Sequence, residues 1–346
     1  MATVLLTGGA GFIGSFIAKE LLRKKHRVVI YDSFIQYISP LDSLYQFYLK
    51  ERLKDIRSSV VIERGDTRDK SHVAHFIAKH RPNHIIHLAA LPIADLSDNN
   101  PEEALSTILT GTVNLLEAIR DIGGVDRFVY ASSSMVYGDF HLEPIKENHP
   151  KNPKDIYGGT KLAGEILTQA YGRRFGIEYT IVRPSAVYGP TDSNQRVSQI
   201  FLESAFANKQ LILHGGGQER LDFTYVEDVA VGFTLATFSK KAANEIFNIT
   251  YGQGRSLKEF SDILKNYFPN LKTVELPRSR YRPKRGTLDI GKAKRLLNYQ
   301  PKYNLEKGIR QYKKFIEQSG ALKLMGIKSP LHPLTRLRRK HHKGQS

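Results

Sequence analysis

Short apolar runs alternate with longer segments of helical spacing through the first 180 residues of the chain. The short runs are bounded by turn residues, which is typical of buried strands. The segments between them carry apolar residues three and four positions apart, which predicts helices that pack by one face. Strands are expected at 4–6, 27–31, 60–64, 84–87, 127–131 and 178–182, and helices at 16–22, 70–79, 101–122 and 156–175.

This alternation predicts an α/β fold built on a Rossmann-type, doubly wound parallel sheet. After residue 183 the pattern becomes irregular and richer in glycine and proline, and the strand-like segment 245–249 is expected to return to the main sheet. We therefore expect a sheet domain at 1–182 with a return segment at about 225–250, and a smaller, discontinuous α/β substrate-binding domain at 183–320. Helical spacing recurs at 257–267, 290–297 and 305–318.

The segment 33–59 is longer than a link between a strand and a helix needs, and it contains Tyr37, Tyr45, Phe47 and Tyr48. A packed amphipathic helix is the favoured interpretation. Contact with the substrate is the alternative.

Composition narrows the class of protein. The 346 residues contain no cysteine, which excludes disulfides, thiolate catalysis and cysteine-bound zinc. The histidines show no zinc-helix spacing, so no metal site is expected. No apolar run reaches the roughly 18–20 residues of a membrane span, and the chain enters a strand without a charged leader. We expect a soluble, cytoplasmic protein.

The formal net charge of +18 raises the question of nucleic-acid binding. Residues 327–346 carry six Lys and Arg residues and no acidic residue, so part of this charge belongs to a basic tail that we expect to be disordered. No basic face with interleaved aromatic residues stands out elsewhere, so nucleic acid is not an expected partner. Contact of the tail with acidic surfaces is the alternative to a solvated end.

A glycine-rich turn between the first strand and the first helix predicts a dinucleotide site. In the segment 7–14, Gly8 permits a tight turn, Gly11 lets the backbone approach a diphosphate, and Gly14 allows close packing of helix on strand. Asp32 ends the second strand, eighteen residues after Gly14, where a carboxylate would meet the adenosine ribose. Because that carboxylate would repel a 2′-phosphate, NAD is the expected cofactor.

A tyrosine and a lysine four residues apart suggest an acid/base pair. Tyr157 and Lys161 project from one face of the predicted helix 156–175, and Ser133 follows the strand 127–131, at the sheet edge where a nicotinamide would lie. Free tyrosine, with a pKa of about 10, is a poor base at neutral pH, but a nearby ammonium favours the phenolate. The serine hydroxyl can hold the reacting oxygen.

With these motifs the chain resembles an extended short-chain dehydrogenase/reductase of the branch that holds nucleotide-sugar epimerases and dehydratases. The resemblance runs from residue 2 to about 318. It implies NAD as cofactor, a nucleotide diphosphate sugar as substrate and a homodimer. The residues that carry it are 7–14, 65–66, 87–90, 111–118, 133, 136–138, 157–161, 183–184, 188–190 and 222–229.

The resemblance also implies a role for individual residues. Tyr157 would be the acid/base, Lys161 would orient the nicotinamide ribose and lower the tyrosine pKa, and Ser133 would supply the active-site hydroxyl. Ser133, Ser134, Arg220 and Arg285 are the candidate substrate contacts, the two arginines for the diphosphate. The expected cofactor contacts are Gly8, Gly11, Phe12, Ile13, Gly14, Asp32, Asp66, Thr67, Leu88, Ala89, Ala90, Tyr157 and Lys161.

Three positions depart from the family pattern on the substrate side: Ile108, Ala186 and Leu221. Ile108 and Ala186 stand where relatives carry asparagine, and Leu221 where they carry arginine, so the nucleotide and the sugar cannot be transferred from relatives.

The two residues after Ser133 bear on the reaction. Dehydratases of the family follow this hydroxyl residue with aspartate and glutamate, whereas this chain has Ser134 and Met135, which cannot shuttle a proton. We therefore expect NAD-dependent epimerisation of a nucleotide diphosphate sugar, most simply at C4, through a transient 4-keto sugar. A dehydratase, a decarboxylase, a net oxidoreductase and a catalytically silent nucleotide sensor are the alternatives.

Overall fold

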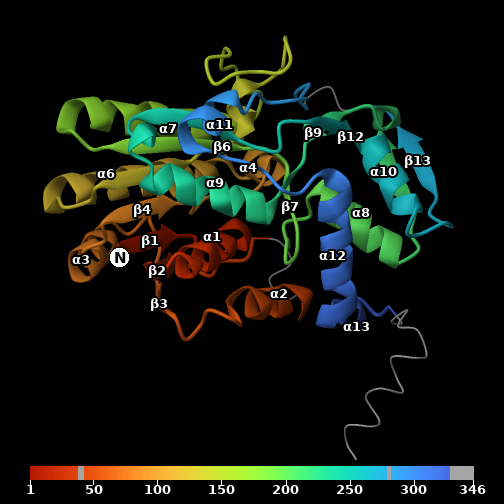
Figure 1. Ribbon diagram of the computed structural model, residues 1–346, viewed down its shortest axis with the longest axis horizontal. Coiled ribbons are helices and arrows are strands. Elements are labelled where there is room, and N and C mark those ends of the chain that lie inside the picture. Colours follow the sequence, from red (N-terminus) through yellow and green to blue (C-terminus); the bar gives the residue numbers. More distant parts are fainter. Residues whose placement is uncertain (38–42, 279–281, 328–346) are drawn as a thin grey trace, which may run out of the picture.

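The computed structural model describes residues 1–37, 43–278 and 282–327, and Figure 1 labels most of its helices and strands. The strands are β1 (Thr3–Thr7), β2 (Arg27–Asp32), β3 (Val60–Arg64), β4 (His84–His87), β5 (Arg127–Ala131), β6 (Tyr179–Pro184), β7 (Val187–Tyr188), β8 (Leu211–His214), β9 (Arg220–Asp222), β10 (Thr224–Tyr225), β11 (Glu245–Ile249), β12 (Gly254–Ser256) and β13 (Thr273–Leu276). The helices are α1 (Phe12–Arg23), α2 (Ser43–Leu53), α3 (Lys70–His80), α4 (Ala94–Asn99), α5 (Pro101–Ala104), α6 (Gly111–Ile122), α7 (Ile156–Phe175), α8 (Val197–Phe206), α9 (Val226–Phe238), α10 (Leu257–Lys265), α11 (Gly291–Leu297), α12 (Leu305–Ser319) and α13 (Ala321–Leu324). A π-helical segment, η1 (Leu105–Thr110), joins α5 to α6, and 3₁₀ turns lie at η2 (Ser134–Tyr137), η3 (Gly215–Gly217) and η4 (Lys240–Ala242).

Seven parallel strands form one sheet in the order β11-β6-β5-β4-β1-β2-β3. The central strand β1 is apolar without interruption because both faces of the sheet are covered. Val4 and Leu6 enter the core on one face, and Leu5 enters the core on the other. The predicted Rossmann-type α/β fold is confirmed.

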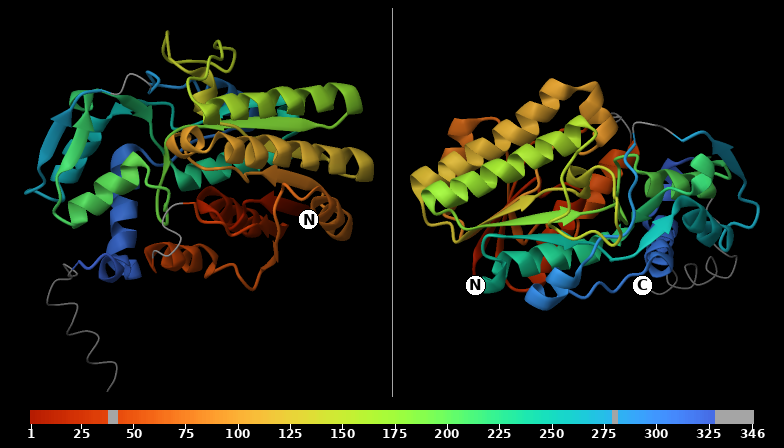
Figure 2. Two further views of the ribbon diagram at one scale, coloured as in Figure 1. Left: turned by 180° about the vertical axis from the view of Figure 1, so that it is seen from behind. Right: turned by 90° about the horizontal axis from the view of Figure 1, so that it is seen from above.

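Helices cover both faces of this sheet (Figures 1 and 2). Side chains of α1, α9 and α11 share a core with one face, and side chains of α3 and α6 share a core with the other. Helix α7 lies beside α6 in the same outer layer. Both α9 and β11 belong to this layered body, although they come after residue 184 in the chain.

The elements α8, β8, β9, α10, β12, β13, α12 and α13 form a second lobe. Its core joins Phe201 and Leu202 of α8 to Phe260 of α10 and to Ile309 and Tyr312 of α12. The lobe lies at one end of the strands (Figure 1), where it faces the loops that follow their carboxyl ends.

Helix α2 connects the two bodies. Its residues Tyr45, Tyr48 and Arg52 follow helical spacing on one face, and all three are buried. Tyr48 belongs to the core of the second lobe, with its ring 6.1 Å from that of Phe315. The packed helix expected within 33–59 is therefore present at 43–53.

Among the described residues, no helix has both the length and the apolar character that crossing a bilayer requires. Residues 328–346, which make up nearly all of the expected basic tail, lie outside the described part of the chain.

Candidate active site

A cavity of about 1020 Å³ lies between the sheet and the second lobe. Its wall includes Gly8 after β1, Asp32 at the end of β2, Leu88 after β4 and Ser132 after β5. This is the edge at which ligands bind in open parallel sheets. Side chains of the second lobe, Leu211 among them, close the other side.

The turn between β1 and α1 forms the floor of one end of this cavity. Gly8 has φ of +71°, and a Cβ there would lie 2.9 Å from the backbone nitrogen of Ala89. A Cβ at Gly14 would overlap the carbonyl oxygen of Gly8, so only glycine lets the helix sit this close to the turn. The first N–H groups of α1, at Phe12 and Ile13, have no partner within the helix and line the cavity, which suits them to a diphosphate.

Asp32 holds this turn and also lines the cavity. Its carboxylate accepts the backbone N–H of Ala10 at 2.9 Å and that of Phe34 at 2.8 Å. Burial raises the pKa of this carboxyl, and the two backbone hydrogen bonds act against the rise. The side chain therefore caps two turns and still presents a face to the cavity.

The structure brings Ser133, Tyr157 and Lys161 to the same cavity wall. Asp155 caps α7 by accepting the N–H of Gly158 at 2.7 Å, which sets where the helix begins. Lys161 donates from Nζ to the carbonyl oxygen of Ala131 at 2.8 Å, and its Nζ lies 5.8 Å from the centroid of the Tyr157 ring. Helix α7 and the end of β5 thus place the three groups together.

Burial controls the charge of this pair. It raises the pKa of the Tyr157 phenol, while the positive charge of Arg196 and a hydrogen bond with Ser133 oppose the rise. It lowers the pKa of the Lys161 ammonium to about 7, against the attraction of Glu165. Perturbed titratable groups that face a cavity beside a dinucleotide turn mark a functional site.

A buried ion pair supports the catalytic wall from behind. Arg183 on β6 donates from Nε and Nη2 to Glu165 on α7 at 2.8 and 2.6 Å, and both side chains are fully buried. Ser132 also donates to Glu165. The pair therefore joins the end of β5, strand β6 and helix α7, the elements that carry the candidate catalytic groups.

All but one of the residues expected from the sequence to form the site lie at this cavity. The exception is Arg220, which is absent from the cavity lining; its guanidinium donates to the carbonyl oxygen of Gly254, because β9 pairs with β12 and directs it there. Those in the lining are Gly8, Gly11, Phe12, Ile13, Gly14, Asp32, Asp66, Thr67, Leu88, Ala89, Ala90, Ser133, Ser134, Tyr157, Lys161 and Arg285.

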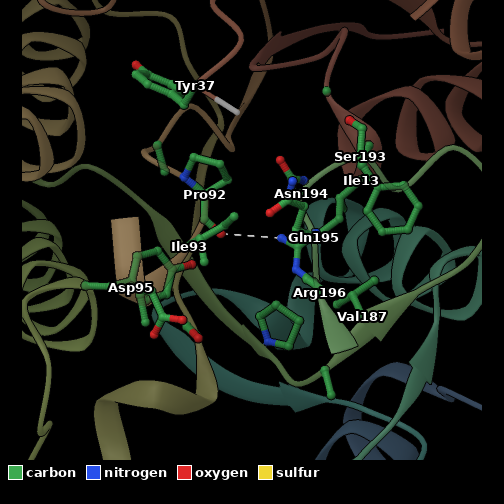
Figure 3. Close-up of a pocket in the computed structure, with 18 of the residues that line it drawn as sticks. Ile13, Tyr37, Pro92, Ile93, Asp95, Val187, Ser193, Asn194, Gln195 and Arg196 are labelled. Carbon is green, nitrogen blue, oxygen red and sulfur yellow. Dashed lines mark hydrogen bonds between the residues drawn. The ribbon is translucent and has the colours of Figure 1, made fainter. Parts of the chain in front are cut away.

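Three arginines that the sequence motifs did not single out also line the cavity: Arg52, Arg196 and Arg282. Arg196 donates to Asp192 at 2.8 Å and to the carbonyl oxygen of Pro92 at 3.4 Å, and its guanidinium lies 5.9 Å from the Phe12 ring. Figure 3 shows Arg196 and its neighbours opposite Pro92 across the pocket. Arg52 lies on α2, and Arg282 pairs with Asp95 at 3.3 Å. None of the three stands in a recognisable motif, and only the surrounding fold marks them.

Asp222 joins three separate segments of the chain behind the cavity. Its carboxylate accepts the hydroxyl of Thr250 at 3.0 Å and the backbone N–H groups of Gly252 and Leu288 at 3.1 Å each. Burial raises the pKa of this carboxyl to about 6, against these hydrogen bonds.

A dinucleotide turn that opens onto a tyrosine–lysine pair and a serine, on a seven-strand parallel sheet, defines a short-chain dehydrogenase/reductase of the extended type. The comparisons give the family within that class. The model of the NAD dependent epimerase/dehydratase family matches residues 4–250, and the chain belongs to this family.

Named relatives include epimerases and dehydratases. A UDP-glucuronate 4-epimerase of Thermodesulfobacterium geofontis is 31% identical over 320 residues, which cover 90% of this chain and 95% of that protein. A dTDP-glucose 4,6-dehydratase of Escherichia coli is 29% identical over 76% of this chain and 74% of its own length. The solved UDP-glucuronic acid 4-epimerase of Bacillus cereus, in complex with UDP-glucuronic acid and NAD, superposes with a TM-score of 0.84 at 28% identity, over 91% of this chain and 99% of its own.

Proposed function

We propose that this protein is an NAD-dependent epimerase that inverts C4 of a nucleotide diphosphate sugar through a transient 4-keto sugar. The observation that carries the proposal is one cavity that holds the dinucleotide turn, the group Ser133, Tyr157 and Lys161, and, next to the serine, Ser134 and Met135. The last two offer no carboxyl for a dehydration. The 4-epimerases among its relatives support the same reaction.

The residues present fit NAD. Gly8 and Gly14 leave no room for a Cβ, so the turn packs tightly, and Gly11, Phe12 and Ile13 at the start of α1 line the cavity, where their N–H groups would bind a diphosphate. Asp32 would hold the adenosine ribose, and Asp66 and Thr67, which line the same cavity, would lie beside the adenine. Bound NAD supplies a hydride acceptor for C4 that returns the same hydride, so that it ends unchanged.

Tyr157 is the proposed acid/base. The ammonium of Lys161 favours the phenolate form of Tyr157, and this phenolate takes the proton of the sugar 4-hydroxyl and becomes a neutral phenol. Ser133 donates its hydroxyl hydrogen to O4, which has become a carbonyl oxygen. After the sugar has turned about its bond to the diphosphate, C4 presents its opposite face, and Tyr157 returns the proton to O4. The hydride and the proton that leave the sugar both return to it, so no external oxidant is needed.

Replacing Tyr157 with phenylalanine tests this assignment. The variant keeps the ring but has no group that can carry the proton, so turnover should fall at least ~100-fold, the lower end of general acid/base catalysis. NAD content, measured after acid release, should stay at the wild-type level. A Tyr157→Phe protein with wild-type turnover would refute the assignment.

Absorbance at 340 nm separates epimerisation from its closest alternative. A net oxidoreductase would change NADH continuously with substrate, whereas an epimerase leaves the absorbance constant while chromatography shows a new sugar nucleotide. UDP, GDP, CDP and dTDP sugars should each be screened, since Ile108, Ala186 and Leu221 depart from the family pattern on the substrate side. Arg285, which lines the cavity, is the proposed contact for the substrate diphosphate, with Ser133 and Ser134 beside the sugar.

The proposal includes the organisation of the chain. Residues 1–182 with about 225–250 would form the NAD-binding domain, and 183–320 the discontinuous substrate-binding domain. A homodimer through α6 and α7 is supported by apolar side chains exposed in that layer: Ile166 at 56%, Leu105 at 48% and Phe175 at 45%. The cytoplasmic location remains a prediction.

A further inference from the structure

Arg52 is a buried guanidinium that has no directly paired carboxylate among the described residues. Its side chain lies on α2 and is 4% exposed. Among the described residues, no carboxylate lies within 4.0 Å of it, and its Nε, which is buried, has no hydrogen-bond partner. Burial lowers the pKa of this group, while the charges of Tyr45, Asp192 and Asp32 oppose the fall. A buried charge that lacks a direct ion pair is costly, so the position suits a further anion.

The place of Arg52 indicates which anion this is. Its side chain lines the cavity together with Asp32 and Tyr45, on the side of the dinucleotide turn. Gly11, Phe12 and Ile13, which offer N–H groups for a diphosphate, belong to the same cavity. Guanidinium groups bind phosphate oxygens through charge-assisted hydrogen bonds.

The same guanidinium holds a segment of the chain from the far side of the cavity. Nη2 of Arg52 donates to the carbonyl oxygen of Thr191 at 2.6 Å and to Oγ of Ser193 at 2.7 Å. Residues 191–196, which we call the strap, run from there to Arg196, which reaches back to Pro92 and to the Phe12 ring. The strap is thus attached to the dinucleotide side at both of its ends, and Figure 3 shows the end at Arg196, which faces Pro92.

The backbone of the strap is strained. Thr191 has φ of +69° and Gln195 has φ of +52°, values that a β-branched residue in particular rarely adopts. Such conformations persist only where surrounding contacts hold them. Oγ1 of Thr191 and Oδ2 of Asp192 are also buried without a hydrogen-bond partner among the described residues. The contacts of Arg52 and Arg196 hold this segment to the dinucleotide side, and the N–H of Gln195, which donates to Gln199 at 2.8 Å, holds it to α8.

We propose that Arg52 binds a diphosphate oxygen of NAD and, through Thr191 and Ser193, fastens the strap over the bound cofactor. This inference rests on the NAD site of the proposed function and adds a residue to it. Cofactor binding and closure of the strap then depend on one side chain. The result is a slowly exchanging cofactor, which a reaction that leaves NAD unchanged requires.

The test measures NAD binding without any sugar substrate. Arg52→Met keeps the length of the side chain but removes its charge and its donors. Loss of a charge-assisted hydrogen bond should weaken NAD binding by about 10- to 100-fold in calorimetry on protein stripped of cofactor. NAD should also be lost during gel filtration of the purified protein. The matched control is Arg57→Met, an exposed arginine just past the same helix, which should leave both quantities unchanged.

A second ligand distinguishes the two diphosphates that could reach this cavity. UDP stands in for the substrate side, and its affinity should be the same in wild type and Arg52→Met. A loss of UDP affinity with NAD affinity intact would overturn the assignment to the cofactor. NAD affinity and retention at wild-type levels would overturn the proposal altogether.

Ser193→Ala keeps the test decisive if Arg52→Met does not fold. It leaves the charge in place and removes one of the two bonds to the strap, so NAD release should accelerate several-fold, as measured by exchange with labelled NAD. An unchanged release rate would contradict the role of the strap. Because no sugar is present, a wild-type protein that retains NAD but epimerises nothing would refute the proposed function and leave this inference standing.

Discussion

Neutralising Glu165 should destabilise the protein far more than neutralising a surface glutamate of the same geometry. Glu165→Gln keeps the shape of the side chain but puts an amide where a carboxylate accepts three donors, two from Arg183 and one from Ser132. The amide has a single oxygen, which can replace only one of the two accepting oxygens of the carboxylate. A donor of Arg183 is then left facing the amide NH2 group, and the charge of Arg183 stays buried without an opposite charge. Breaking a buried pair in this way costs ~3–5 kcal/mol.

The control is Glu20→Gln on α1. Glu20 accepts Nε and Nη2 of Arg23 at 2.7 and 2.6 Å, the same two-bond geometry, but the Arg23 side chain is 63% exposed. Exposed pairs of this kind contribute about 0–1 kcal/mol. Urea unfolding of the cofactor-free proteins, followed by circular dichroism, gives both free energies of unfolding. Equal losses in the two variants, or a loss below about 1 kcal/mol for Glu165→Gln, would refute the argument from burial.

Two further predictions concern groups whose pKa is shifted by burial. Lys161 has a pKa of about 7 in the fold against 10.5 in the unfolded chain, so between these pH values the unfolded chain binds more protons and the stability of the fold rises with pH. In guanidinium titrations, wild type should therefore gain stability relative to Lys161→Met between pH 7 and 10. A stability difference that stays constant over this range would contradict the prediction. Asp222 has a pKa of about 6 against 3.8, so here the folded chain binds more protons, and stability falls as pH rises from 4 to 6. Asp222→Asn should remove this dependence of stability on pH. It should also cost about 1–3 kcal/mol of stability at pH 5, since its amide group would face the donors Thr250 and Leu288. Guanidinium titrations between pH 4 and 7 measure both effects, and Asp262→Asn, at an exposed aspartate, is the control.

The sheet could be predicted because its signal is local. Val4, Leu5 and Leu6 are apolar in sequence since both faces of β1 are covered, and that pattern is visible without knowing what covers them. Tyr157 and Lys161 could be predicted for the same reason, because four positions on one helix fix their relation whatever the rest of the chain does.

The remaining site residues depend on contacts between distant parts of the chain. Arg52 meets Thr191, which lies 139 positions later, and no pattern within α2 distinguishes it from the other basic residues there. Arg220 was selected for its place beside a family motif, but the pairing of β9 with β12 directs it to Gly254. The direction of a side chain at such positions depends on which elements pack together, and the residues next to it in the sequence do not predict that packing.

The place of β11 at the edge of the sheet affects how the protein can be made. Strand β6 ends at Pro184, and its neighbour β11 is complete only at Ile249, about 65 residues later. Until then the emerging polypeptide carries an open strand edge, and α1 lacks α9, which packs against it. At ~5–20 residues per second this interval lasts roughly 3–13 s, long enough for a chaperone to engage the exposed edge of β6 before β11 pairs with it.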